Sequence, residues 1–277
     1  MFVFDPGMVV LLALSIGLYW RAVRVLRRRG YRVPSGQQVC WYAGVACLAI
    51  GLLGPPDALA DDLFVAHMGE HLLIADIAGP LLLFGLRTPV LVFFLPKPIL
   101  VPLAHRKRLR AAFRFLRRPL VAIPVFALVL YGWHFAGPFD AALRNPSLHA
   151  LQHLSFVAAS MLVWWSAVEP QRRHMSGELW KIGYILGARI ISMFLATALI
   201  FARSPFYSYY GDKPREHGLS PLTDQQVGGG LMLGLDLLVM LFALSFFFWS
   251  AAKEYDRREA QQQQQQQQQP TSPAATG

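Results

Sequence analysis

The sequence predicts an all-α fold, a polytopic membrane helix bundle with about seven transmembrane helices. Of its 277 residues, 55% are hydrophobic and only 15% are charged, whereas a soluble domain carries about 25% charged residues. The apolar residues form long runs, and the basic residues are concentrated in the short segments between these runs. Together these observations indicate a chain that crosses a lipid bilayer several times.

Seven apolar runs come close to the roughly 20 residues that an α-helix needs to cross a bilayer. A further apolar stretch, Val90–Leu103, is interrupted by prolines. We expect it to lie at the membrane interface or to enter the membrane and return. Cys40 and Cys47 fall in one apolar run, where we expect buried small side chains. The predicted spans are residues 7–26, 38–55, 64–86, 119–136, 147–168, 179–202 and 228–250.

Composition also predicts the two ends of the bundle. No basic stretch precedes the first apolar run, so we expect no cleavable signal peptide. Beyond the last run lie glutamines from Gln261 to Gln269 and then prolines, a composition that cannot bury apolar surface. We therefore divide the chain into a transmembrane bundle, residues 1–253, and a disordered, low-complexity cytoplasmic tail, residues 254–277.

Basic residues predict the orientation, because short cytoplasmic loops are enriched in Lys and Arg. They concentrate in alternate connections, and the second connection is acidic instead. The alternation predicts an external N-terminus and a cytoplasmic C-terminus. It also explains the formal charge of +10 as a topology signal, so nucleic acid is not expected as a partner. The basic residues are Arg27, Arg28, Arg29 and Arg32, then Arg106 to Arg118, then Arg172, Arg173 and Lys181, and finally Lys253, Arg257 and Arg258.

Two pairs of histidines stand four residues apart inside apolar runs. His67 and His71 begin the third predicted span, and His149 and His153 begin the fifth. Residues i and i+4 share one face of a helix, so each pair can direct two ring nitrogens toward one point. With His134 at the outer end of the fourth span, five imidazoles are predicted at a similar shallow depth near the outer surface.

The start of the fifth span strengthens this placement. Asn145 followed by Pro146 is typical of an N-cap and a first helical residue. The remaining histidines are expected elsewhere, His217 in an external loop and His105 and His174 on the cytoplasmic side. Imidazole groups suit copper, zinc, iron and nickel. Met68 could add a thioether, but it points about 100° away from its neighbour around the helix.

Charged residues within the spans form a second signal. Asp76, Arg189 and Asp236 fall in the third, sixth and seventh spans, where each costs roughly 2.5–3.5 kcal/mol near the helix centre. One interpretation is an ion pair that fixes helix packing, and the other is a polar path for protons or an ion beneath the histidines. Glycines spaced four apart, Gly183 with Gly187 and Gly230 with Gly234, predict close helix contacts in the last two spans.

Two blocks of the sequence combine histidines with glycines, prolines and tryptophans. The first is the heptapeptide His67–Leu73, followed by Gly79-Pro80-Leu81-Leu82 and Gly85. The second contains Trp133-His134, Pro138, Ala141-Ala142-Leu143, Pro146, His149-Ala150-Leu151-Gln152-His153 and Trp164-Trp165. Together the two blocks resemble the CtaG-type integral membrane assembly factors of haem-copper cytochrome c oxidase. The resemblance covers about residues 60–170 closely, and the seven-span layout agrees with the family as a whole.

The resemblance implies a non-enzymatic role in maturing the oxidase, through supply of copper to its catalytic subunit. It implies a bacterial plasma membrane location, oxidase subunits as partners, and a possible external copper chaperone. It also implies His67, His71, His134, His149 and His153 as candidate copper ligands. The chain departs from the family at Glu70, where the family usually has a non-acidic residue.

Two other functions stay open at this point. Glu70 makes residues 67–71 a literal HxxEH pattern, which is typical of inverted zinc proteases with two histidine ligands and a glutamate general base. Alternatively, Glu70 lies outside the coordination shell and orients an imidazole. The second function is that of a b-type haem electron carrier. Haem uses one axial histidine per helix. Each helix here offers two, which is more than one haem needs.

Overall fold

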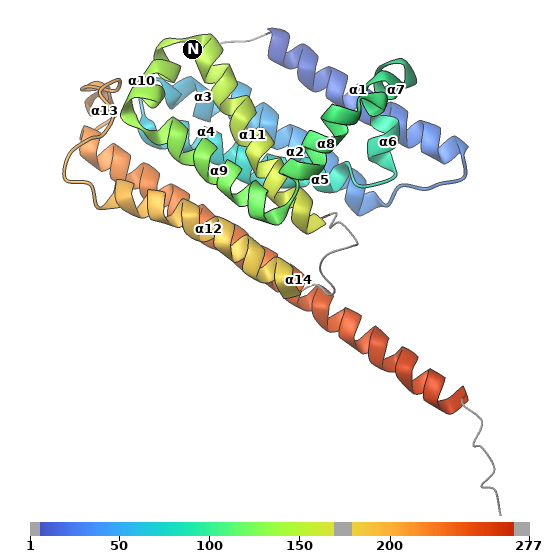
Figure 1. The fold of residues 1–277 in the computed structure, drawn as a ribbon. Coiled ribbons are helices and arrows are strands. Elements are labelled where there is room, and N and C mark those ends of the chain that lie inside the picture. Colours follow the sequence, from blue (N-terminus) through green and yellow to red (C-terminus); the bar gives the residue numbers. More distant parts are fainter. Residues whose placement is uncertain (1–5, 169–178, 269–277) are drawn as a thin grey trace, which may run out of the picture.

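The computed structural model describes residues 6–168 and 179–268, and every regular element within these ranges is a helix (Figure 1). This confirms the predicted all-α class. The helices are α1 (Pro6–Arg28), α2 (Ser35–Leu53), α3 (Pro55–Ala60), α4 (Phe64–His71), the π-helix η1 (Leu72–Ala78), α5 (Gly79–Gly85), α6 (Val90–Phe94), α7 (Lys97–His105), α8 (Lys107–Leu116), α9 (Pro119–His134), α10 (Ala136–Arg144), α11 (Pro146–Val168), α12 (Leu179–Ile200), α13 (Lys213–Glu216) and α14 (Pro221–Gln268).

Six helical segments of the described chain are long and apolar enough to cross a membrane. A seventh span is obtained if α9 and α10 are counted together, although the chain bends by 71° between them. The span expected at residues 119–136 thus ends in a sharp corner at Phe135. The Pro-rich stretch forms the short helices α6 and α7, in agreement with the expectation that it does not cross the membrane as one helix.

The third span is continuous but not uniformly α-helical. It begins as α4, widens into the π-helix η1 and returns to α-helix in α5. The hydroxyl of Ser160 on α11 donates a hydrogen bond of 2.7 Å to the carbonyl of Ala75 inside the π-helix. A π-helix adds a residue to the turn, so it changes the face on which later residues lie, and such segments are frequent at functional sites.

Polar contacts between helix ends hold one end of the bundle together. Asp224 at the start of α14 accepts hydrogen bonds from the backbone amides of Phe64 and Val65 at the start of α4, at 2.7 and 3.0 Å. These amides have no partner within their own helix. In Figure 1 the short helices α3, α10 and α13 gather at this end, and α6, α7 and α8 lie toward the other.

Helices α12 and α14 lie side by side (Figure 1), but not through the glycines that the sequence analysis selected. A Cβ atom added at Gly183, Gly230 or Gly234 would meet nothing within 4 Å. The close approach occurs at Gly229, where a Cβ would lie 2.9 Å from the carbonyl oxygen of Ala196. The expectation of close contacts at the four-residue spacing was therefore wrong.

The last helix extends further than composition predicted. Helix α14 continues past residue 253 to Gln268 as one helix, because Ala, Glu, Gln, Lys and Arg are all good helix formers. Residues 254–268 thus differ from the disordered tail expected there. The rest of the tail, residues 269–277, and the basic loop residues Arg172, Arg173 and His174 lie outside the described residues.

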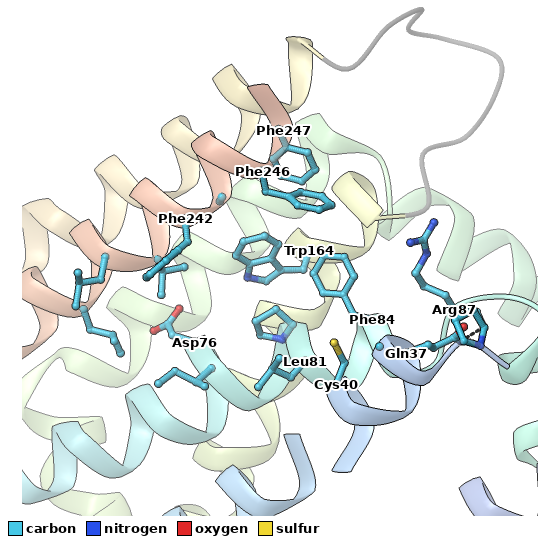
Figure 2. A pocket seen from close by; sticks show the side chains of 18 residues that line it. Gln37, Cys40, Asp76, Leu81, Phe84, Arg87, Trp164, Phe242, Phe246 and Phe247 are labelled. Carbon is cyan, nitrogen blue, oxygen red and sulfur yellow. Dashed lines mark hydrogen bonds between the residues drawn. The ribbon is translucent and has the colours of Figure 1, made fainter. Parts of the chain in front are cut away.

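An apolar pocket of about 740 Å³ lies between α2, η1, α5, α11 and α14 (Figure 2). Its walls are mostly aliphatic and aromatic, and Figure 2 shows Trp164, Phe84 and Phe246 around it. Asp76 from the π-helix is the acidic residue in the lining. The pocket thus adjoins the charged residues inside the bundle but not the four paired histidines.

Candidate metal site

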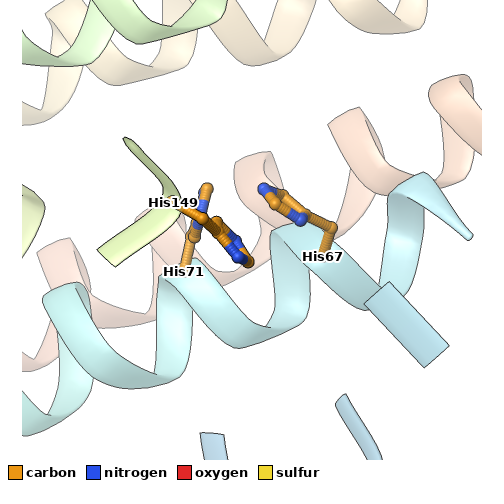
Figure 3. Close-up of side chains that lie close together, drawn as sticks. All are labelled: His67, His71 and His149. Atoms are coloured by element: carbon orange, nitrogen blue, oxygen red, sulfur yellow. The ribbon is translucent and has the colours of Figure 1, made fainter. Parts of the chain in front are cut away.

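The two histidine pairs face each other across α4 and α11. The fifth span begins as predicted, because the Asn145 side chain accepts hydrogen bonds from the amides of Ser147 and Leu148 at 2.9 and 3.3 Å. This cap fixes the first turn of α11, from which His149 and His153 project. Figure 3 shows His67 and His71 on successive turns of α4 with His149 beside them.

The centroids of the four imidazole rings lie at the corners of a nearly flat rectangle. Ring centroids within each pair are 4.2 Å apart, and those joined across the helices, His67 to His149 and His71 to His153, are 5.1 Å apart. Both diagonals are 6.5 Å. Each centroid therefore lies about 3.2 Å from a shared centre. That distance fits a coordinating imidazole, since metal–nitrogen bonds are ~2.0–2.1 Å and the nitrogen lies roughly 1 Å from its ring centroid.

The nitrogens of these rings are buried and available. His67 is fully buried and His71 is 6% exposed, and neither ring nitrogen of either residue has a hydrogen-bond partner among the described residues. The Nε2 atoms of His149 and His153 are likewise unpartnered. Buried polar atoms without partners are rare and costly. Ligand atoms of His67, His71 and His149 lie within 4.8 Å of one another, so these residues fit a bound metal ion.

Glu70 lies against the second pair. Its side chain is fully buried, and its Oε1 is 3.3 Å from His153 Nε2. Neither carboxylate oxygen makes a hydrogen bond within the described part of the chain. Glu70, His149 and His153 form a second group of possible metal ligands, also within 4.8 Å of one another. The glutamate thus points into the site.

His134 and Met68 occupy different places from the four paired histidines. His134 donates from Nδ1 to the carbonyl of Leu130 at 2.7 Å, and its ring lies near Phe139 and Phe156, at centroid distances of 6.1 and 5.8 Å. These two phenylalanines also contact His67 and His71. The rings of Phe139 and Phe156 therefore lie near both His134 and the paired histidines, and His134 is a neighbour of the cluster and not one of its four members. Met68 is 1% exposed and packs in the hydrophobic core.

Aromatic residues close the site on the side of α10 and the loop that contains Tyr207. Phe139 from α10 contacts His67 at a centroid distance of 5.1 Å and Tyr207 at 4.0 Å. Phe64 stacks on Tyr207 at 5.1 Å. The Tyr207 hydroxyl donates to the His134 carbonyl at 3.0 Å, and burial raises the pKa of this phenol, so it remains a neutral donor. This cover excludes water from His67.

The charged residues inside the spans form one cluster. Arg189 Nη1 lies 2.5 Å from Asp76 Oδ1 and 2.7 Å from Asp236 Oδ1. Arg189 and Asp236 are each 1% exposed. The ion pair considered in the sequence analysis is therefore present, with both aspartates as partners. The π-helix sets the position of Asp76, five residues after His71.

Sequence reasoning identified the four clustered histidines but not the residues that enclose them. Phe139, Phe156 and Tyr207 carry no pattern that distinguishes them from ordinary core aromatics. The π-helix has no clear sequence signal either. The bend at Phe135 could have been suspected, since Gly137 and Pro138 follow two and three residues after it.

The fold and the site define a polytopic membrane protein with a buried histidine cluster between its third and fifth spans. The chain belongs to the cytochrome c oxidase caa3 assembly factor family (Caa3_CtaG), which matches residues 17–254. This confirms the resemblance found in the sequence, and the protein is thus a member of an oxidase assembly factor family.

The chain is also similar to curated proteins of two mycobacteria. It is 24% identical over 242 residues to an uncharacterized protein of Mycobacterium bovis and, to the same extent, to one of Mycobacterium tuberculosis. The match covers 83% of this chain but only 36% of each relative. The chain thus spans about a third of the length of these relatives. No solved structure matches it.

Proposed function

We propose that this protein binds copper through His67, His71, His149 and His153 and supplies it during assembly of a haem-copper oxidase. The observation that carries the proposal is the convergence of four imidazoles from two helices, with buried nitrogens that have no other described partner. Neutral imidazole is a good copper ligand. Oxidase assembly factors act on an enzyme whose catalytic centre contains copper, so copper is the metal we infer.

The proposal assigns the protein a binding role and no catalysis. Its partners would be oxidase subunits, above all the copper-containing catalytic subunit, and a copper chaperone on the outer side. The location would be a bacterial plasma membrane, with the histidines near the outer face. His134 would support the site from behind Phe139 and Phe156 and would not complete the first coordination shell.

The geometry does not favour the haem alternative. The diagonal pairs have a separation that two axial ligands could adopt, but the plane between them is filled by the other two imidazoles. His67 and His149 stack with planes inclined by only 15°, which leaves no space for a macrocycle between them. A purified protein with a Soret band would contradict this argument.

The protease alternative requires three ligands and an open coordination position for water. Here the ring of a fourth histidine, His153, lies beside the other three, and aromatic residues cover His67. Glu70→Gln separates the two functions, because it removes the general base that a protease needs. We expect the variant to retain most of its Cu(I) binding and to support oxidase assembly. Loss of oxidase assembly in a variant that still binds Cu(I) would favour the protease.

Metal analysis of the purified full-length protein tests the proposal directly. The protein is expressed in copper-supplemented cells, purified in detergent and measured for copper, zinc and iron. We expect about one copper per chain and strongly reduced copper in a His67→Ala/His149→Ala variant. Equal copper in both preparations would contradict the proposal, as would stoichiometric iron or zinc in place of copper.

A further inference from the structure

Glu70 is a buried carboxyl group that has no hydrogen-bond partner among the described residues. It is fully buried and both carboxylate oxygens lack hydrogen bonds among the described residues. An isolated carboxylate in such surroundings is very unfavourable unless a cation lies beside it. His153 Nε2, at 3.3 Å, approaches it most closely, but a neutral imidazole offers no compensating charge.

Two groups of possible ligands overlap at this point. One consists of three imidazoles, from His67, His71 and His149, and the other of Glu70, His149 and His153. His149 belongs to both. The first group offers only imidazole nitrogens, whereas the second adds a carboxylate oxygen, so the two differ in the ion that they suit. Nitrogen and oxygen ligands together are typical of Cu(II) and Zn(II) sites.

We propose that Glu70 is a direct metal ligand and that the one site offers two alternative ligand sets, both of which include His149. One set consists of imidazoles alone, and the other combines imidazoles with the Glu70 carboxylate, which selects divalent ions. This inference rests on the proposed metal-binding function and names the residue that sets its selectivity. The sequence patterns treated Glu70 as a base or as an outer-shell group, and the structure places it within the ligand group.

The electrostatic argument predicts the size of the effect. The attraction between the carboxylate and a bound ion is proportional to the ionic charge, so it is twice as large for a divalent ion as for Cu(I). When the carboxylate is replaced by an amide, the logarithm of the affinity should therefore fall twice as far for the divalent ion. On the order of a threefold loss for Cu(I) corresponds to about a tenfold loss for Zn(II) or Cu(II).

The test is a pair of competition titrations on the full chain in detergent. A chromophoric Cu(I) chelator under reducing conditions reports Cu(I) affinity, and a Zn(II) chelator reports divalent affinity. We expect Glu70→Gln to lower Zn(II) affinity about tenfold and Cu(I) affinity about threefold. Glu70→Asp keeps the charge and should preserve the ratio of the two affinities. Glu70→Asp also shows whether misfolding, and not the lost charge, is responsible for the lower affinities of Glu70→Gln.

His67→Ala is the matched opposite variant, because His67 belongs only to the imidazole group. We expect it to lower Cu(I) affinity about tenfold and Zn(II) affinity about threefold or less. An unchanged Zn(II)/Cu(I) ratio in Glu70→Gln would overturn the inference and leave the copper proposal intact, provided the parent protein binds copper. If the parent protein binds Zn(II) in a Glu70-dependent manner but no copper, the copper proposal fails and the Glu70 ligand stands. If neither metal binds, both fail.

Discussion

His67 and His149 stack across two helices, with ring centroids 5.1 Å apart and planes inclined by 15°. Two charged imidazolium rings would repel each other at this distance in a buried site. Neutral rings would not, and the neutral ring is the form that coordinates metals. The contact therefore joins α4 and α11 at the point where we propose that copper binds.

The bundle orientation is the first prediction. Alternation of basic loops places the N-terminus and residues 204–227 outside and the α8 region and the C-terminal tail in the cytoplasm. Alkaline phosphatase folds only outside the cytoplasm, so fusions after Arg110 or after Arg258 should be inactive. A fusion within residues 204–227 should be active. Activity after Arg110 would contradict the orientation.

The buried ion pair predicts a large loss of stability on removal of its cation. Arg189→Ala leaves Asp76 and Asp236 without their partner inside the bundle, and breaking a buried pair in this way costs about 3–5 kcal/mol. Lys253→Ala is the control, because Lys253 is exposed. Thermal unfolding in detergent should separate the two variants clearly.

A double-mutant cycle completes this test. If the pairing holds, Asp236→Ala combined with Arg189→Ala should destabilise less than the two single variants together, because the unpaired charge is gone. The same holds for Asp76→Ala. Strict additivity for both aspartates would show that the contacts contribute nothing to stability.

Neighbouring glycines in α14 provide a matched pair of packing variants. Gly229→Ala would place a Cβ 2.9 Å from the Ala196 carbonyl oxygen and from the Leu199 Cβ, whereas Gly230→Ala meets nothing within 4 Å. Overpacking costs about 1–3 kcal/mol, so Gly229→Ala should lower the melting temperature. Gly230→Ala should leave it unchanged or raise it, since alanine favours helix. The reverse order would contradict the observed packing of α12 on α14.

The sequence predicted the spans and the four clustered histidines because both depend on local patterns. Apolar runs indicate membrane helices, and the spacing of His67 with His71 and of His149 with His153 places each pair on one face. The π-helix, the bend at Phe135 and the close approach at Gly229 depend on packing between helices. Gly230 and Gly229 differ only in what lies opposite them, which no local pattern records.

The distal part of α14, residues 261–268, should be dispensable. Its side chains, where described, are exposed, and a run of glutamines buries no apolar surface. Deletion of residues 261–277 should leave the amount of protein in the membrane and the oxidase activity unchanged. Loss of oxidase activity at normal protein levels would show that this segment binds a required partner.

The central claim is that two helices share one copper site, and oxidase copper content tests it most directly. His71→Ala and His153→Ala each remove one ligand from a different helix, so both should insert normally yet yield an oxidase with little copper. Excess copper in the medium should partly restore it. The controls His105→Ala, at the exposed end of α7, and His174→Ala should leave oxidase copper unchanged. Normal oxidase copper in both the His71→Ala and the His153→Ala strains would contradict the proposal.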